Sequence, residues 1–87
     1  MIKISFSKKF LKQFEKLEDD LQKEVKEKIK LFTNTSNHKT LNIHKLNGEM
    51  KRQHSFSVNY KTRIVFEYAS SKKEAILLVI GDHAVYK

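Results

Sequence analysis

The spacing of hydrophobic residues changes halfway along this chain, and that change limits the folds open to it. Between residues 10 and 32, apolar residues recur every three or four positions, which is the spacing of one helix face. Residues 2–6, 56–60 and 64–68 instead alternate between two kinds of side chain, as strands with two different faces do. The pattern therefore predicts a strand, two helices and then further strands.

Polar residues mark where the two helices begin and end. Ser7 occupies the expected N-cap of the first helix, whose apolar stripe ends at Leu17. The acidic run 18–20 supplies the caps and the negative charge that the start of a second helix favours. This second helix reaches Phe32 and stops in the polar run 33–37, whose side chains compete for helix hydrogen bonds. The first 37 residues thus predict a strand followed by a helical hairpin.

The second half of the chain has the spacing of strands and turns. Residues 41–46 lead into Asn47-Gly48, a dipeptide suited to turns with positive φ. Residues 55–68 predict an antiparallel hairpin with its connection at 60–62. Residues 74–80 form the most apolar strand, which we expect at the centre of the sheet.

Segregated helices and strands indicate an α+β fold of order β-α-α-β-β-β. The helical hairpin is expected on one face of a small, mainly antiparallel sheet. With 87 residues, the chain is expected to form one domain over 1–87. The uncovered face of the sheet is expected to carry Lys51, His54, Arg63 and His83.

The composition excludes several kinds of site. The chain has no Cys, which excludes disulfide scaffolds, thiolate zinc sites and cysteine nucleophiles. It has three Asp, two of them adjacent, and only Gly48 and Gly81 as glycines, so neither a metal site nor a glycine-rich phosphate loop is visible. We therefore expect no cofactor.

Positive charge is concentrated in one stretch of the chain. The formal net charge is +8, and residues 39–63 hold six basic residues against one acidic residue. Such a field favours polyanions, above all nucleic acid, although an ordinary lysine-rich surface fits equally well. No apolar run approaches the roughly 18 residues that would span a membrane. We expect no membrane partner and a cytoplasmic location.

The remaining side chains suit the cleavage of RNA without a metal ion. A base takes the proton from a ribose 2′-OH, the oxygen attacks the adjacent phosphate, and an acid protonates the departing 5′-oxygen. Histidine serves in either proton transfer near neutral pH, so His44, His54 and His83 are candidates. His83 has the strongest local case because it follows a glycine bend after an apolar strand. Arg63 is a candidate for holding the phosphate.

Each candidate also has a purely structural interpretation. His44 and His54 fit surface histidines on strands, and Arg63 fits an ion pair with a neighbouring glutamate. Tyr86 is as easily a packing residue as a platform for a base. Residue types alone leave these alternatives open.

Four segments of the chain resemble the RelE/ParE superfamily of toxins from type II toxin–antitoxin systems. They contain H-K-L-x-G beginning at His44, Y-x-x-R-I-x-F beginning at Tyr60 and I-G-x-H-x-x-Y beginning at Ile80, after the lysine- and phenylalanine-rich segment 6–17. The resemblance covers almost the whole chain in the same order. It implies a bacterial or archaeal toxin that a cognate antitoxin neutralises.

The branch of the superfamily decides which activity the resemblance implies. RelE-type members cut mRNA in the ribosomal A site without a metal, whereas ParE-type members poison DNA gyrase. Among RelE-like toxins the chain is most similar to the YafQ group, whose two outer histidines match His44 and His83. The superfamily arginine matches Arg63, and the terminal aromatic matches Tyr86. The middle YafQ histidine falls near Ser57 instead.

On this basis we predict a ribosome-dependent mRNA endonuclease. His83 is the expected general acid, and His44 or His54 is the expected general base, with His54 standing in for the missing middle histidine. Arg63 is expected to bind the scissile phosphate. Further RNA and phosphate contacts are expected from Lys45, Lys51, Arg52, Lys61 and Tyr86.

The sequence also leaves two other functions open and implies several partners. The alternatives are a gyrase inhibitor that acts by binding protein and an inactive member that binds only its antitoxin. The expected partners are the ribosome, mRNA and an acidic antitoxin that folds over the basic face of the sheet.

Overall fold

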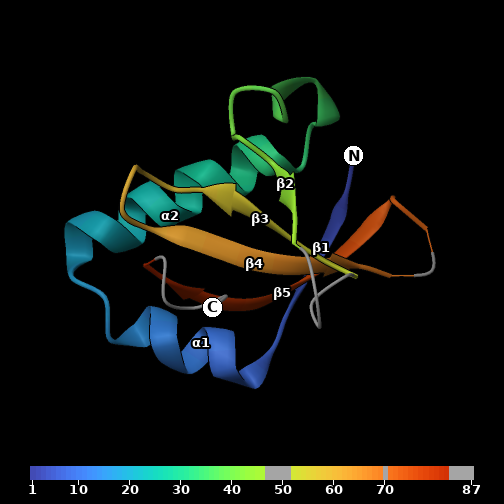
Figure 1. Ribbon diagram of the computed structural model, residues 1–87. Coiled ribbons are helices and arrows are strands. Elements are labelled where there is room, and N and C mark those ends of the chain that lie inside the picture. The colour runs from blue at the N-terminus through green and yellow to red at the C-terminus, as the bar shows by residue number, and fades with distance from the viewer. Residues whose placement is uncertain (47–51, 70, 83–87) are drawn as a thin grey trace.

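Two helices pack against one side of a five-stranded sheet in the computed structural model (Figure 1), which describes residues 1–46, 52–69 and 71–82. The elements follow the predicted order, with a short 3-10 helix and the two-residue strand β2 added after the second helix. They are β1 (Lys3–Phe6), α1 (Lys8–Glu15), α2 (Asp19–Phe32), η1 (Thr35–Asn37), β2 (His44–Lys45), β3 (Gln53–Ser57), β4 (Arg63–Tyr68) and β5 (Glu74–Gly81).

The strands lie in the order β1-β5-β4-β3-β2. Only the β1–β5 pairing is parallel, and the other three pairings are antiparallel. This arrangement confirms the predicted α+β class with a mainly antiparallel sheet. The last strand lies inside the sheet between β1 and β4, as predicted, but β4 and not β5 is the middle strand.

The first helix is tied to β5 at both of its ends. The hydroxyl of Ser7 accepts a hydrogen bond from the Phe10 amide at 2.9 Å, which confirms the predicted N-cap, and it donates to the Leu78 carbonyl at 2.6 Å. Nearly two turns further on, Gln13 Oε1 accepts a hydrogen bond from the Ile80 amide at 2.8 Å. A polar face of α1 therefore fixes this helix against the sheet.

The second helix ends in an aromatic cluster at the centre of the core. The Phe32 ring is buried and stacks on Phe56 with centroids 4.6 Å apart. It also meets the edge of Phe66 at 4.7 Å and stacks on His38 at 4.9 Å. These contacts join the C-terminal end of α2 to β3 and β4.

The strand β3 ends earlier than the alternation of its residues predicts. The predicted strand runs to Tyr60, but β3 stops at Ser57 because Asn59 begins a turn. Asn59 Oδ1 accepts hydrogen bonds from the amides of Lys61 and Thr62, at 2.9 and 2.8 Å. Its Nδ2 donates to Glu24 Oε1 on α2 at 2.8 Å. An asparagine side chain that replaces backbone partners makes this turn tight and well anchored.

The segment before β3 is mostly loop. Only His44 and Lys45 of residues 41–46 pair as a strand, which the predicted order of elements does not include. The backbone turns at Asn42, whose φ is 52°, a left-handed conformation that asparagine tolerates well. The Leu41 carbonyl accepts a hydrogen bond from the Ser57 amide at 2.9 Å, so this loop continues along the edge of β3. The predicted Asn47-Gly48 turn lies outside the described residues.

Strand register divides the sheet into two faces. Side chains alternate along a strand, and residues paired directly across antiparallel strands share a face. We call the side that packs against α1 and α2 the helix face and the opposite side the far face. The helix face carries Phe56 and Phe66, which contact Phe32. The far face carries the paired residues Ser55 and Val65, which are buried at its centre.

Candidate functional site

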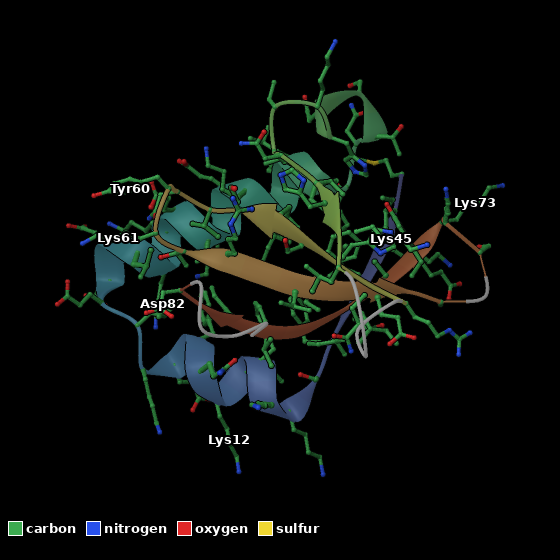
Figure 2. The ribbon with its side chains drawn as sticks, in the orientation of Figure 1. Lys12, Lys45, Tyr60, Lys61, Lys73 and Asp82 are labelled. Atoms are coloured by element: carbon green, nitrogen blue, oxygen red, sulfur yellow. The ribbon has the colours of Figure 1, made fainter. Side chains whose placement is uncertain are left out.

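Two of the predicted site residues form the edge strand β2. His44 pairs with Ser55 and Lys45 pairs with His54, so their side chains belong to opposite faces of the sheet. Both residues are exposed. Figure 2 shows Lys45 among the side chains near this edge. His44 is therefore the predicted histidine that the structure presents on the far face.

His54 lies on the helix face, contrary to the sequence-based expectation. It pairs with Phe66, whose ring lies 5.5 Å away, and it meets the ring of Tyr68 edge-on at 5.1 Å. The expectation failed because His54 continues the alternation that starts at the buried Phe56. His54 and Arg63 are thus on opposite faces.

The surroundings of His54 favour its neutral form. Burial, followed by the positive charges of Lys45 and Lys72, lowers the pKa of His54 below its ordinary value of 6.5. Its Nδ1 is buried, with no hydrogen-bond partner among the described residues. These features are typical of a ring that packs within an aromatic cluster.

Arg63, at the start of β4, reaches a hollow at the end of the β3–β4 hairpin. Its partner across the strands is Ser57, which places it on the far face, the face of His44. We call the concavity of about 330 Å³ beside it the hairpin hollow. Its described lining residues are Lys28, Thr40, Leu41, Asn42, Ser57, Val58, Asn59, Tyr60 and Arg63. Two of these are cations and none is an acid, so the hollow favours anions.

The guanidinium of Arg63 is only partly satisfied within the described part of the chain. Its Nε and Nη1 atoms are buried and have no hydrogen-bond partner there. Buried donors without partners cost free energy, and native structures keep few of them. An anion bound beside Arg63 would accept hydrogen bonds from these donors.

The other predicted site residues are spread around the molecule. Arg52 is exposed just before β3, and Lys61 is exposed in the β3–β4 turn (Figure 2). The predictions for His83, Lys51 and Tyr86 fall outside the described residues. The structure thus brings His44 and Arg63 to one face and separates His54 from them.

His44 and Arg63 lie near enough to act on one substrate. Their strands are two apart in the sheet, and their positions differ by two residues along the strand. From standard strand spacings their backbones are about 12 Å apart. One nucleotide, together with the side chains of a histidine and an arginine, spans such a separation. The pair can therefore combine a proton acceptor with a phosphate-binding cation.

Sequence reasoning missed Lys28, Asn42 and Tyr60 as neighbours of Arg63 in the hairpin hollow. Lys28 comes from α2, where the sequence shows it as one lysine among many. The available signal for Tyr60 was its place in the predicted connection at 60–62, since connecting segments run over the protein surface.

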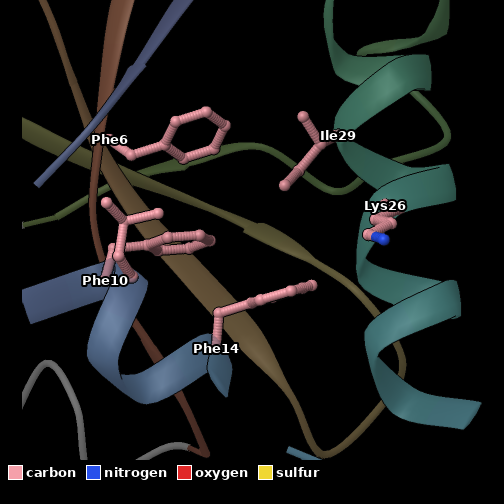
Figure 3. Close-up of a pocket in the computed structure, with 6 residues that line it drawn as sticks. Phe6, Phe10, Phe14, Lys26 and Ile29 are labelled. Atoms are coloured by element: carbon pink, nitrogen blue, oxygen red, sulfur yellow. The ribbon is translucent and has the colours of Figure 1, made fainter. Parts of the chain in front are cut away.

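A second concavity lies between α1 and α2 (Figure 3). It holds about 150 Å³ and is lined by Phe6, Phe10, Leu11, Phe14, Lys26 and Ile29. Leu11 is 46% exposed there, although the helical stripe predicts it as a core residue. The lining is apolar apart from Lys26 and offers no acid or base for catalysis.

Neither a metal-binding cluster nor a membrane-spanning helix occurs among the described residues. No three His, Cys, Asp or Glu side chains come together there in a way that could hold a metal ion. Within the same residues, neither helix is long and apolar enough to cross a membrane.

Comparison with known proteins gives matches to structures alone. No protein-family model matches the sequence, and no curated protein matches it. Among solved structures, YafQ from E. coli matches with a TM-score of 0.75 and 16% identity over 97% of this chain and 96% of YafQ. The YoeB–YefM toxin–antitoxin complex from Staphylococcus aureus matches with a TM-score of 0.71 and 15% identity, over 95% of this chain and 98% of the matched chain. The chain has the RelE/YafQ-type toxin fold.

The same fold occurs in a conserved hypothetical protein from Helicobacter pylori, with a TM-score of 0.71 and 22% identity over 97% of both chains. The predicted resemblance to RelE/ParE toxins is thus confirmed at the level of the fold. On the RelE/YafQ-type fold of this chain, His44 and Arg63 share the far face and the hairpin hollow adjoins Arg63.

Proposed function

We propose that this protein is the toxin of a type II toxin–antitoxin system and cleaves mRNA on the ribosome without a metal ion. The observation that carries the proposal is the likeness to YafQ over 97% of the chain, with a TM-score of 0.75. The placement of His44 and Arg63 on the same face of the sheet adds a chemical reason to favour RNA cleavage. Ribosomes and mRNA place the expected action in the cytoplasm.

In the proposed reaction, His44 is the general base. It removes the proton from the ribose 2′-OH, and the 2′-oxygen attacks the adjacent phosphorus. A 2′,3′-cyclic phosphate forms as the bond to the 5′-oxygen breaks, and His83 supplies the proton that the 5′-oxygen takes up. Arg63 stabilises the charge on the phosphoryl oxygens through its guanidinium N–H groups. His54 is the less favoured base because it lies on the helix face.

Conditional expression in bacteria tests this function. Induction should arrest translation and yield cut mRNA, and His83→Ala should abolish growth inhibition while the purified variant keeps the wild-type circular dichroism spectrum. Undiminished toxicity of a folded His83→Ala protein would contradict the assignment of the acid.

A gyrase-directed toxin is the second candidate, because one match of the same fold is a YoeB/ParE toxin from Agrobacterium tumefaciens. That match has a TM-score of 0.70 and 12% identity over 94% of this chain and 99% of the other. A gyrase poison would change DNA supercoiling and induce the SOS response while leaving mRNA intact. An inactive member that binds only its antitoxin would show neither effect.

An acidic antitoxin is the proposed protein partner. Several structures of this fold are toxin–antitoxin complexes, among them RelBE from E. coli and YoeB–YefM from Staphylococcus aureus. The net charge of +8 favours an acidic segment on the partner. The complex should therefore weaken as salt rises. A complex of equal affinity in low and high salt would rule out this electrostatic account.

A further inference from the structure

The hairpin hollow has the chemistry of a phosphate-binding site. Lys28 reaches it from α2 and Arg63 from β4, so two elements far apart in sequence supply its cations. Thr40, Asn42 and Ser57 add hydroxyl and amide groups to the lining. Phosphate oxygens accept hydrogen bonds from all of these side-chain types.

The unsatisfied hydrogen-bond donors of Arg63 favour a bound anion in the hollow. Two of its guanidinium nitrogens are buried and lack hydrogen-bond partners among the described residues. The acid Glu24 of α2 does not line the hollow, and its carboxylate accepts a hydrogen bond from Asn59 at 2.8 Å. An anion in the hollow would offset the positive charge of Arg63 and Lys28 where water is partly excluded.

Tyr60 stands at the rim of the same hollow and is 84% exposed. Single exposed aromatic residues are common and usually need no explanation. Tyr60, however, is held on a turn that Asn59 fixes through two backbone hydrogen bonds and one bond to α2. The backbone that carries the ring is thus fixed beside two cations, and the ring itself is accessible to a ligand.

We propose that the hairpin hollow binds a phosphate of single-stranded RNA and that the adjoining base stacks on Tyr60. The inference rests on the proposed function, because it adds an RNA-binding subsite beside Arg63. A flat exposed ring next to a cationic groove is the usual arrangement for unpaired nucleotides. An acidic peptide would use the cations but would have no base for the ring, so RNA is the better fit.

Position links the subsite to the candidate histidine. The Ser57 amide bonds to the Leu41 carbonyl, and Ser55, two residues earlier, pairs with His44. The hollow therefore starts about 7 Å along the edge of the sheet from His44. A nucleotide bound there would be next to the one that is cut.

Binding of a short, fluorescently labelled single-stranded RNA to the full chain tests the proposal. The RNA carries 2′-O-methyl groups, so it cannot be cut through the 2′-oxygen, and anisotropy reports binding alone. The variants are Tyr60→Ala, Tyr60→Phe and Lys28→Gln. Lys73→Gln is the matched control, because Lys73 is an exposed lysine in the β4–β5 connection, far from Tyr60 (Figure 2).

Tyr60→Ala should weaken binding by about 5- to 100-fold, and Tyr60→Phe should retain it because the ring remains. Lys28→Gln should lower the slope of log affinity against log salt by about 0.7, the effect of one lost phosphate contact on a single strand. Lys73→Gln should leave both quantities unchanged.

Binding by Tyr60→Ala and Lys28→Gln equal to that of the Lys73→Gln control would overturn the proposal. Preference of the wild type for a poly-aspartate peptide over RNA would overturn it in favour of a protein-docking site. The outcomes stay distinct from those of the proposed function. If the wild type cuts mRNA on ribosomes and the variants bind RNA normally, only the subsite is refuted. If the variants lose RNA binding but the wild type cuts no mRNA, only the cleavage is refuted.

Discussion

The imidazole of His54 stacks on the ring of Phe66, with centroids 5.5 Å apart and planes inclined by 24°. Phe66 in turn meets Phe32 of α2, so His54 belongs to the aromatic cluster of the core. Because burial, then Lys45 and Lys72, disfavour the imidazolium, the folded protein binds a proton at His54 less readily than the unfolded chain does.

Stability should therefore fall in mild acid. The pKa of His54 is near 6.5 in the unfolded chain and lower in the fold. Between those two values the unfolded state holds more protons, so the free energy of unfolding rises with pH. The contribution of His54 is fully present above about pH 6.5 and is lost as pH falls through the folded pKa. Urea denaturation at several pH values from 5 to 8, about a unit apart, measures this slope.

The variant His54→Phe provides the control. Phenylalanine keeps a ring against Phe66 and Tyr68 and removes the buried, unpartnered Nδ1. Its stability at pH 7 should equal or exceed that of wild type, and the fall towards pH 5 should be shallower. An unchanged slope would show that another group causes the acid sensitivity.

The sequence correctly predicts the features of the fold that depend on residues close together in the chain. The N-cap Ser7 and the end of α2 at Phe32 follow from side chains next to one another in the chain, and both are correct. The face of His54 also follows from local spacing, because His54 stands two residues before the buried Phe56, and the expectation overlooked this alternation. The end of β3 instead depends on the bond from Asn59 to Glu24 on another element. Local spacing cannot reveal such long-range choices.

The hairpin hollow was missed for the same reason. Lys28 and Arg63 are 35 residues apart in sequence and meet only through packing of α2 beside the β3–β4 turn. Residue type alone identified Arg63, but its neighbours needed the fold.

The Phe32 ring should be a highly sensitive position in the core. It is fully buried and contacts three rings, those of His38, Phe56 and Phe66. Phe32→Ala would leave a large cavity and cost about 3–5 kcal/mol, a large share of the stability of a domain this small. Phe32→Leu should cost less and stay folded. Thermal unfolding followed by circular dichroism ranks the three proteins, with Leu31→Ala, at the exposed neighbouring residue, as control.

The guanidinium of Arg63 should lower the stability of the free protein and be required for mRNA cleavage. Its buried Nε and Nη1 have no partners among the described residues, and such unsatisfied groups cost about 1–3 kcal/mol. Arg63→Met keeps the long apolar stem and removes the guanidinium, so the free protein should unfold at equal or higher urea concentration. The same variant should lose mRNA cleavage. A variant both less stable and fully active would contradict both roles.

His44 gives the sharpest test of the chemistry because its exposure separates catalysis from folding. The side chain lies on an edge strand and is exposed, so His44→Ala should change the free energy of unfolding by less than about 0.5 kcal/mol. Loss of a general base lowers rates by about 10²–10⁴-fold, and mRNA cleavage on purified ribosomes should fall by that factor. Lys73→Ala, at an exposed lysine of the β4–β5 connection that has no proposed part in the reaction, should keep the activity, and the His54→Phe variant should also cleave. If His54→Phe were inactive and His44→Ala active, the base would be His54, and RNA would have to reach the helix face.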